Sequence, residues 1–157
     1  KSPLILLRSN HLFSRCKCQV RRLSGNRWQR KGCVFMLSPD LQRIEHIYDY
    51  CVAIEKTIMR YGNSFDNFCN DPDYQKSVSF SILQIGELSS RLSMEFRQAT
   101  ADRVQWGPMK GMRNLVAHNY GSMDMDIVWE TATTDIPALK RFCEQQISSY
   151  LRPPLEP

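Results

Sequence analysis

The sequence predicts an all-α protein, a bundle of four or five helices. Apolar residues recur at three- and four-residue spacing through most of the chain after residue 37, which is the period of an amphipathic helix. Capping residues followed by proline mark two helix starts. No stretch shows a convincing strand pattern or an internal repeat, and 157 residues fit one domain.

The first helix is expected over residues 39–61. Ser38 offers a capping hydroxyl, and Pro39 suits the first helical position because its missing amide donor is not needed there. Gly62 suits the left-handed conformation that ends many helices. A short helical turn is then expected within residues 64–70.

A long central helix is expected to begin at Asp71-Pro72 and to run to Phe96. Gly86 lies inside it, at a cost of about 1 kcal/mol relative to alanine, which indicates close packing of another helix. Residues 100–108 are expected to form a loop that Trp106 anchors to the core. A short helix is then expected over residues 109–119.

The last helix is expected to begin at Ser122 or Asp124. Pro137 must kink or restart it because proline has no amide donor, and Asp135 is placed to cap a restart. Regular structure is expected to end at Arg152-Pro153-Pro154, so residues 36–150 form the helical domain and residues 151–157 a tail.

Charge divides the chain into two parts. The formal net charge is +5, but residues 1–35 carry no acid and nine basic residues. The rest has twelve basic and sixteen acidic residues, a balance of −4, and offers no strong field for polyanions. Residues 1–35 are therefore expected to be a disordered or non-native leader, with Met36 favoured as the natural initiator. An organelle transit peptide and an RNA-touching basic arm are the alternatives.

The six cysteines do not have the spacing of zinc ligands, so no metal or other cofactor is expected. Those of the body, Cys51, Cys69 and Cys143, are predicted to be buried free thiols in a reducing compartment. No apolar run reaches the length of a membrane span, and a cytoplasmic location without membrane contact is expected.

One octet, residues 113–120, brings together groups suited to phosphodiester chemistry. Arg113 can hold a phosphate through its planar fork of donors, and His118 can transfer a proton near neutral pH. Five residues place these two about 140° apart on a helix. Asn114 shares a face with His118 and could orient its imidazole. Tyr120 lies on the stripe of Arg113 if the helix persists that far.

Two arrangements would unite Arg113 and His118: an unwound helix end near His118, or two copies of the motif facing each other across a two-fold axis. Each residue also has a purely structural interpretation: a surface ion pair for Arg113, a structural histidine for His118 and a packing residue for Tyr120. Glu87 is a lesser candidate that either forms an ion pair in the bundle or lines the cleft.

The octet resembles the R-x-x-x-x-H-x-Y motif of the HepT-like toxins of the HEPN superfamily. The resemblance covers residues 37–150, and further similar segments follow in the same order at 43–47, 73–75, 84–88, 111–114 and 128–130. It leaves the leader out.

The resemblance implies an up-and-down HEPN-like bundle that forms homodimers. It also implies a metal-independent ribonuclease site in which Arg113 and His118 are the catalytic residues and Asn114 supports them. It implies the toxin of a type VII toxin–antitoxin pair, acting on RNA, with a nucleotidyltransferase antitoxin as partner that adenylylates Tyr120. The alternatives are a non-catalytic, nucleotide-binding regulatory partner of a nucleotidyltransferase and a structural helical adaptor.

Overall fold

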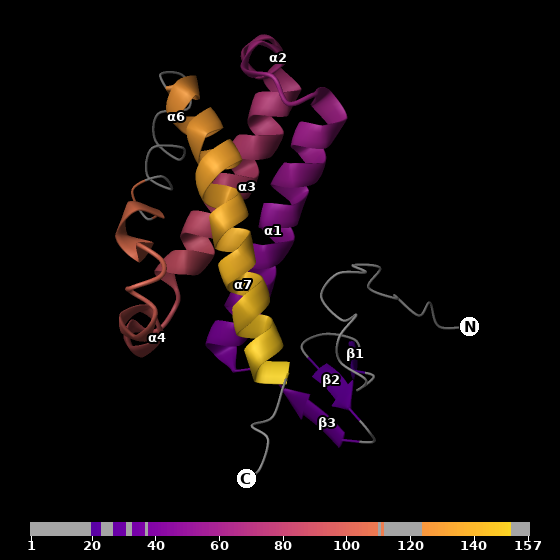
Figure 1. Cartoon of the computed structure of the whole chain (residues 1–157), viewed down its shortest axis with the longest axis vertical. Coiled ribbons are helices and arrows are strands. Elements are labelled where there is room, and N and C mark those ends of the chain that lie inside the picture. The colour runs from indigo at the N-terminus through magenta and orange to yellow at the C-terminus, as the bar shows by residue number, and fades with distance from the viewer. Residues whose placement is uncertain are drawn as a thin grey trace, which may run out of the picture.

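A computed structural model describes residues 20–22, 27–30, 33–36, 38–109, 111 and 124–151. Three long helices, α1 (Pro39–Tyr61), α3 (Pro72–Ser90) and α7 (Ile136–Leu151), lie side by side (Figure 1). The shorter helices are α2 (Phe65–Asn70), α4 (Met94–Ala99) and α6 (Met125–Glu130). The body of the chain is therefore a helical bundle, as the sequence predicted.

Helix α1 begins and ends where the sequence placed it. The hydroxyl of Ser38 accepts a hydrogen bond from the amide of Leu41, at 3.3 Å. Gly62 has a φ of 94°, which side chains other than hydrogen rarely allow, and its amide donates to the carbonyl of Ile58 at 2.9 Å. Both ends are thus fixed by residues that carry a local signal.

Helix α3 ends at Ser90, short of the predicted end at Phe96. The amide and hydroxyl of Ser93 both donate to the carboxylate of Asp40, at 3.0 and 2.5 Å. The same hydroxyl accepts from the amide of Phe96 and so caps the N-terminus of α4. The break therefore depends on an acceptor 53 residues away in sequence, which no local pattern could reveal.

The last helix contains a π-helical segment, Thr131–Asp135, between α6 and α7. Asp124 caps α6 by accepting from the amide of Asp126 at 3.0 Å, as predicted. The irregularity predicted at Pro137 is this π-helical segment, which directly precedes α7. Its wider turn accommodates the proline ring and the hydrogen bond that proline cannot donate. Asp135 lies within the π-helical segment, so the prediction that it caps a restart is wrong.

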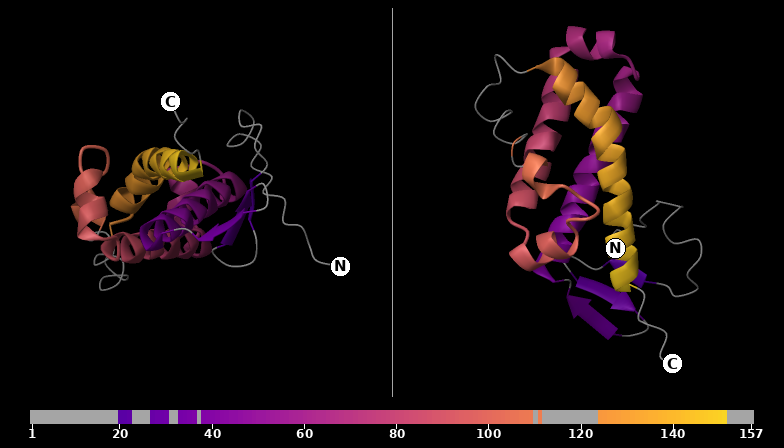
Figure 2. Two further views of the ribbon diagram at one scale, coloured as in Figure 1. Left: turned by 90° about the horizontal axis from the view of Figure 1, so that it is seen from below. Right: turned by 60° about the vertical axis from the view of Figure 1, so that its left-hand side comes forward.

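The core runs between α1, α3 and α7 and takes its apolar residues from the predicted faces. Trp106 is 7% exposed, and its indole N–H donates to the hydroxyl of Thr100 at 2.9 Å, so it anchors the preceding segment as expected. Residues 106–109 are already helical, which makes the predicted loop over residues 100–108 shorter than expected. Figure 2 shows this segment crossing from α4 back toward α3.

The prediction of no strand is wrong for the residues before the bundle. Strands β1 (Val20–Arg22), β2 (Arg27–Arg30) and β3 (Cys33–Met36) form an antiparallel sheet in that order. Arg30 pairs with Cys33, and Trp28 with Phe35. Strands of three or four residues are too short to show a period, and β3 crosses the boundary drawn at Met36.

The thiols of the body differ in exposure. Cys51 and Cys143 are buried, as predicted, on the facing helices α1 and α7. Cys69 near the end of α2 is exposed, so its predicted burial is wrong. The short helix α2 buries Phe68 and leaves the other side of its single turn open to solvent.

Candidate functional site

The motif residues Arg113, Asn114, His118 and Tyr120 lie outside the described residues. The distances between these four side chains are therefore not part of the described structure, and their roles stay predictions. What the structure does describe is the chain on both sides of the motif, up to Gly111 and again from Asp124.

The chain that enters the motif is held by buried groups. Trp106 makes ring contacts with Phe96 and Phe142, at centroid distances of 6.2 and 5.8 Å. Met109 packs against the core, and its sulfur accepts a hydrogen bond from the Ser89 hydroxyl at 3.6 Å. The last turn before the motif is therefore fixed to α3 and α7.

The chain that leaves the motif is also fixed. After the Asp124 cap, Val128 is fully buried, and the Trp129 ring lies 5.3 Å from that of Phe68. The motif thus connects two anchored points, and neither anchor uses a motif residue.

A cavity of 440 Å³ lies between α3, the turn that enters the motif, and the π-helical segment with the start of α7. We call it the π-turn cavity. Its polar lining side chains are Arg103, Gln105, Thr131 and Asp135. The rest of the lining is mostly apolar and consists of Ile82, Ile85, Gly86, Val104, Pro108, Met109, Ile136, Ala138 and Leu139.

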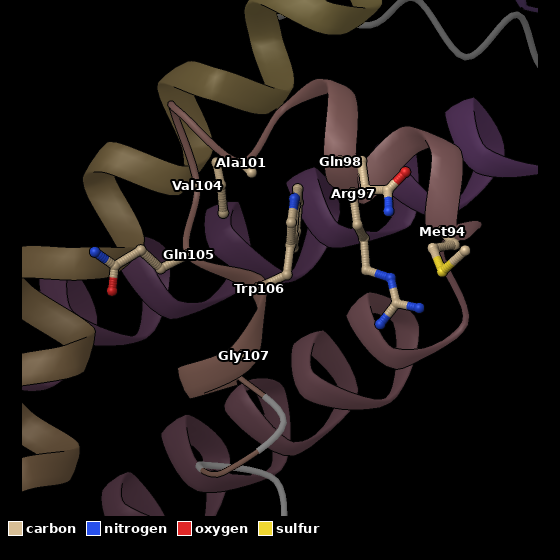
Figure 3. Close-up of a pocket in the computed structure, with 8 residues that line it drawn as sticks. All are labelled: Met94, Arg97, Gln98, Ala101, Val104, Gln105, Trp106 and Gly107. Atoms are coloured by element: carbon tan, nitrogen blue, oxygen red, sulfur yellow. The ribbon is translucent and has the colours of Figure 1, made fainter.

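A second, shallower hollow of 420 Å³ lies on α4 and the segment that follows it (Figure 3). Arg97 and Trp106 are the largest side chains on it, and Met94 and Gly107 belong to its rim. The Nε atom of Arg97 is buried and has no hydrogen-bond partner in the part of the chain that the structure describes. The hollow's other polar lining side chains are Gln98 and Gln105, on an otherwise apolar surface.

Two buried thiols and one lysine of the bundle, Cys51, Cys143 and Lys140, have raised pKa values. Burial, followed by the charge of Glu55, raises the pKa of Cys51 to about 12, so its thiol stays protonated at neutral pH. Lys140 lies 2.5 Å from Glu55; burial alone would lower the lysine pKa, but this hydrogen bond and the carboxylate charge together raise it. Glu87 forms an ion pair with Arg91 at 4.0 Å, one of its two predicted roles.

Within the described residues, no group of three or more His, Cys, Asp or Glu side chains could hold a metal ion. None of the helices in that part has the length and apolar character needed to cross a membrane.

A model of the family described as "Ribonuclease HepT-like" matches residues 42–146, two thirds of the chain, and this stretch includes the whole motif. The chain belongs to the HepT-like ribonuclease family. The match leaves out the residues of the small sheet, in agreement with the resemblance seen in the sequence.

Relatives of this HepT-like chain come from bacteria and archaea. A candidate RNase of Caldanaerobacter subterraneus subsp. tengcongensis is 33% identical over 109 residues, which is 69% of this chain and 91% of the relative. A candidate RNase of Methanocaldococcus jannaschii is 28% identical over 55% of this chain and 87% of its own length. A protein of Thermococcus cleftensis named as a probable ribonuclease HepT is 32% identical over 48% of this chain and 68% of its own length. No solved structure matches.

Sequence reasoning missed the π-turn cavity. Its polar groups come from two separate segments and form no motif, because Arg103 and Asp135 are 32 positions apart in the chain. The one local signal was Pro137, which predicted an irregular helix without showing that the irregular turn would border a cavity.

Proposed function

We propose that this HepT-like ribonuclease is a metal-independent endoribonuclease that acts in the cytoplasm as the toxin of a type VII toxin–antitoxin pair. One observation carries the proposal: the complete R-x-x-x-x-H-x-Y spacing of Arg113, His118 and Tyr120 lies inside the stretch that matches the ribonuclease family. These residue types suit RNA cleavage by attack of the ribose 2′-hydroxyl on the adjacent phosphorus.

His118 acts as the general base or acid, a role typically worth 10²–10⁴ in rate. Arg113 binds the phosphate and stabilises the charge that develops on it in the transition state. Asn114 fixes the imidazole tautomer or contacts the RNA. The attacking 2′-oxygen loses its proton to one histidine while the leaving 5′-oxygen gains a proton from another, which a homodimer supplies by pairing two motifs across its axis. No step in this scheme needs a metal.

Tyr120 is the control point. A nucleotidyltransferase antitoxin transfers an adenylyl group to its hydroxyl, which adds bulk and negative charge beside Arg113 and His118. The added phosphate repels the RNA backbone and blocks the cleft. The net charge of −4 on the residues after 35 argues against tight non-specific RNA binding, so substrate choice relies on the shape of the RNA or on its ribosome context.

The catalytic assignment is tested with purified His118→Ala in the presence of EDTA and a mixed RNA pool. We expect loss of cleavage by at least about a hundredfold, with unchanged helical content and unchanged oligomeric state. The matched control is His46→Ala, which removes an exposed histidine from α1 and should cleave like the unaltered protein. Cleavage by His118→Ala at the normal rate would refute the assignment.

Control by the partner is tested by incubating the protein with a nucleotidyltransferase and labelled ATP. The unaltered chain should take up label, and Tyr120→Phe should not. Full labelling of Tyr120→Phe would place the modification at another residue. If the unaltered protein cuts no RNA but still binds nucleotide, the non-catalytic regulatory alternative is the correct one.

A further inference from the structure

We infer that the π-turn cavity binds an unpaired guanine base, with Asp135 as the residue that selects it. The inference rests on the proposed function, because the natural source of the base is then the RNA substrate. It assigns a specificity-determining site to residues outside the motif.

The cavity has the size and the wall chemistry of a base-binding site. Its 440 Å³ exceeds what one nucleobase occupies. Ile82, Ile136 and Leu139 are almost fully buried and belong to the apolar wall against which a base can lie. Single-stranded RNA is read in this way, by bases that leave the stack and enter pockets with polar groups at their edges.

The polar groups at the mouth have complementary hydrogen-bonding capacity. Asp135 is exposed, no described residue forms an ion pair or hydrogen bond with its carboxylate, and a carboxylate accepts through two oxygens. Arg103 donates one N–H to Gln145, and its guanidinium lies 5.0 Å from the centre of the Phe142 ring. These contacts hold Arg103 in place at the cavity while its other N–H groups can still donate.

Guanine is the base whose edge fits this arrangement. Its N1–H and its N2 amino group are adjacent donors, which a carboxylate accepts in a bidentate pair. Its O6 and N7 are acceptors for the N–H groups of Arg103 or Gln105. Adenine, cytosine and uracil each lack two adjacent donors on one edge, so Asp135 discriminates against all three.

The cavity is within reach of the cleavage motif. Met109 lies in its wall, and Arg113 follows four residues later. Four residues of chain span at most about 14 Å, whatever path they take. A base held in the cavity therefore belongs to a nucleotide at the scissile phosphate or a few positions from it. Asp135 would therefore set the base preference next to the cut.

The first test uses free nucleotides and the unaltered protein, because a mononucleotide has no internucleotide phosphodiester to cleave. Guanosine, adenosine, cytidine and uridine 5′-monophosphates are titrated and followed by calorimetry. We expect guanosine monophosphate to bind at least about tenfold more tightly than the others, and Asp135→Asn to remove that preference. Asp126→Asn is the matched control, since Asp126 is also exposed but does not line the cavity.

A steric variant tests the location independently. Ala138 lines the cavity and is exposed, so Ala138→Trp can fill the space without displacing the buried core. It should weaken binding of guanosine monophosphate by at least about tenfold while the urea midpoint stays within error. Equal binding by the unaltered and the Ala138→Trp proteins would overturn the inference.

The second test uses RNA and separates this inference from the proposed function. Oligonucleotides with guanine replaced by inosine, which lacks the N2 amino group, are cleaved and the cut sites are mapped. We expect the unaltered protein to prefer guanine about tenfold over inosine near the cut, and Asp135→Asn to lose that preference. Cleavage with no difference between the two bases refutes the guanine site alone. Absence of any cleavage, together with selective guanosine monophosphate binding, refutes the ribonuclease proposal and leaves a nucleotide site in place.

Discussion

Helix α3 takes part in two contrasting regions of the bundle. Near its start it joins an aromatic cluster formed by Tyr61, Phe65, Phe68, Tyr74 and Trp129. Further along, its residues Ile82, Ile85 and Gly86 form one wall of the π-turn cavity. The first region is filled by rings, and the second is left open with polar groups at its mouth. The same helix thus contributes stability at one point and a recognition surface at the other.

The aromatic cluster has the geometry of a packed core. Tyr61 and Tyr74 stack with centroids 4.9 Å apart and ring planes 17° apart, and Phe68 meets Tyr74 edge to face at 5.2 Å. Both Phe68 and Tyr74 are fully buried. Such ring pairs stabilise the fold beyond what the burial of their apolar surface contributes. The side chains at the cavity mouth are exposed and contribute little to the free energy of unfolding.

The largest effect on stability is expected from Phe68→Ala in the aromatic cluster. Truncating a fully buried ring that touches Tyr74 and Trp129 should lower the free energy of unfolding by about 3–5 kcal/mol. Urea unfolding followed by circular dichroism measures this. Phe80→Ala is the control, because Phe80 is 56% exposed and should change stability far less. Equal losses in the two variants would show that the cluster is not a packed core.

A smaller loss is expected from Gly62→Ala, beside the same cluster. Gly62 has a φ of 94° and its carbonyl accepts a hydrogen bond from the Tyr74 hydroxyl at 3.3 Å. An alanine there should cost about 1–3 kcal/mol of backbone strain. Gly107→Ala is the matched control, since an added Cβ there meets no atom within 4 Å. A Gly62→Ala protein as stable as this control would contradict the strain argument.

Asp40→Asn tests the contact that ends α3 before the cavity segment. It removes the charge that accepts from Ser93 and should cost about 1 kcal/mol at neutral pH. Burial would raise the pKa of Asp40, but hydrogen bonds from Ser93 and Arg43 together hold it below its ordinary value of 3.8. This stabilisation is therefore complete above pH 3.8 and is lost as the pH falls through the lower, folded-state pKa.

The measurement for Asp40 is the difference in unfolding free energy between Asp40→Asn and the unaltered chain, followed from neutral pH into the acid range. It should shrink below pH 3.8. Asp66→Asn is the control, because Asp66 also lies in the first turn of a helix and shares the favourable dipole effect without the Ser93 bonds. A difference that is independent of pH would contradict the role of the charge.

The smallest stability effect is expected from Asp135→Asn at the cavity mouth, within about 0.5 kcal/mol of the unaltered chain. Ile136→Ala, one residue further, removes a side chain that is 1% exposed and should cost about 2–5 kcal/mol. Urea unfolding of the two variants measures the change in unfolding free energy at a position on the cavity and at the buried position next to it. A large loss for Asp135→Asn would mean that this carboxylate supports the fold.

The sequence predicted the parts of the fold that depend on near neighbours. The bounds of α1 follow from Ser38, Pro39 and Gly62, and the start of α3 follows from Asp71, whose carboxylate accepts from the amides of Asp73 and Tyr74. The motif at residues 113–120 is likewise a local pattern, and it lies inside the stretch that matches the family.

Tertiary structure decided what depends on groups distant along the chain. The end of α3 required Asp40 to meet Ser93, and the small sheet required three segments of three or four residues to pair. The π-turn cavity required Arg103 and Asp135 to border one space. Helix caps and apolar periods act over three or four residues and are therefore visible in the sequence, whereas a cavity exists only where packed helices fail to fill the space between them.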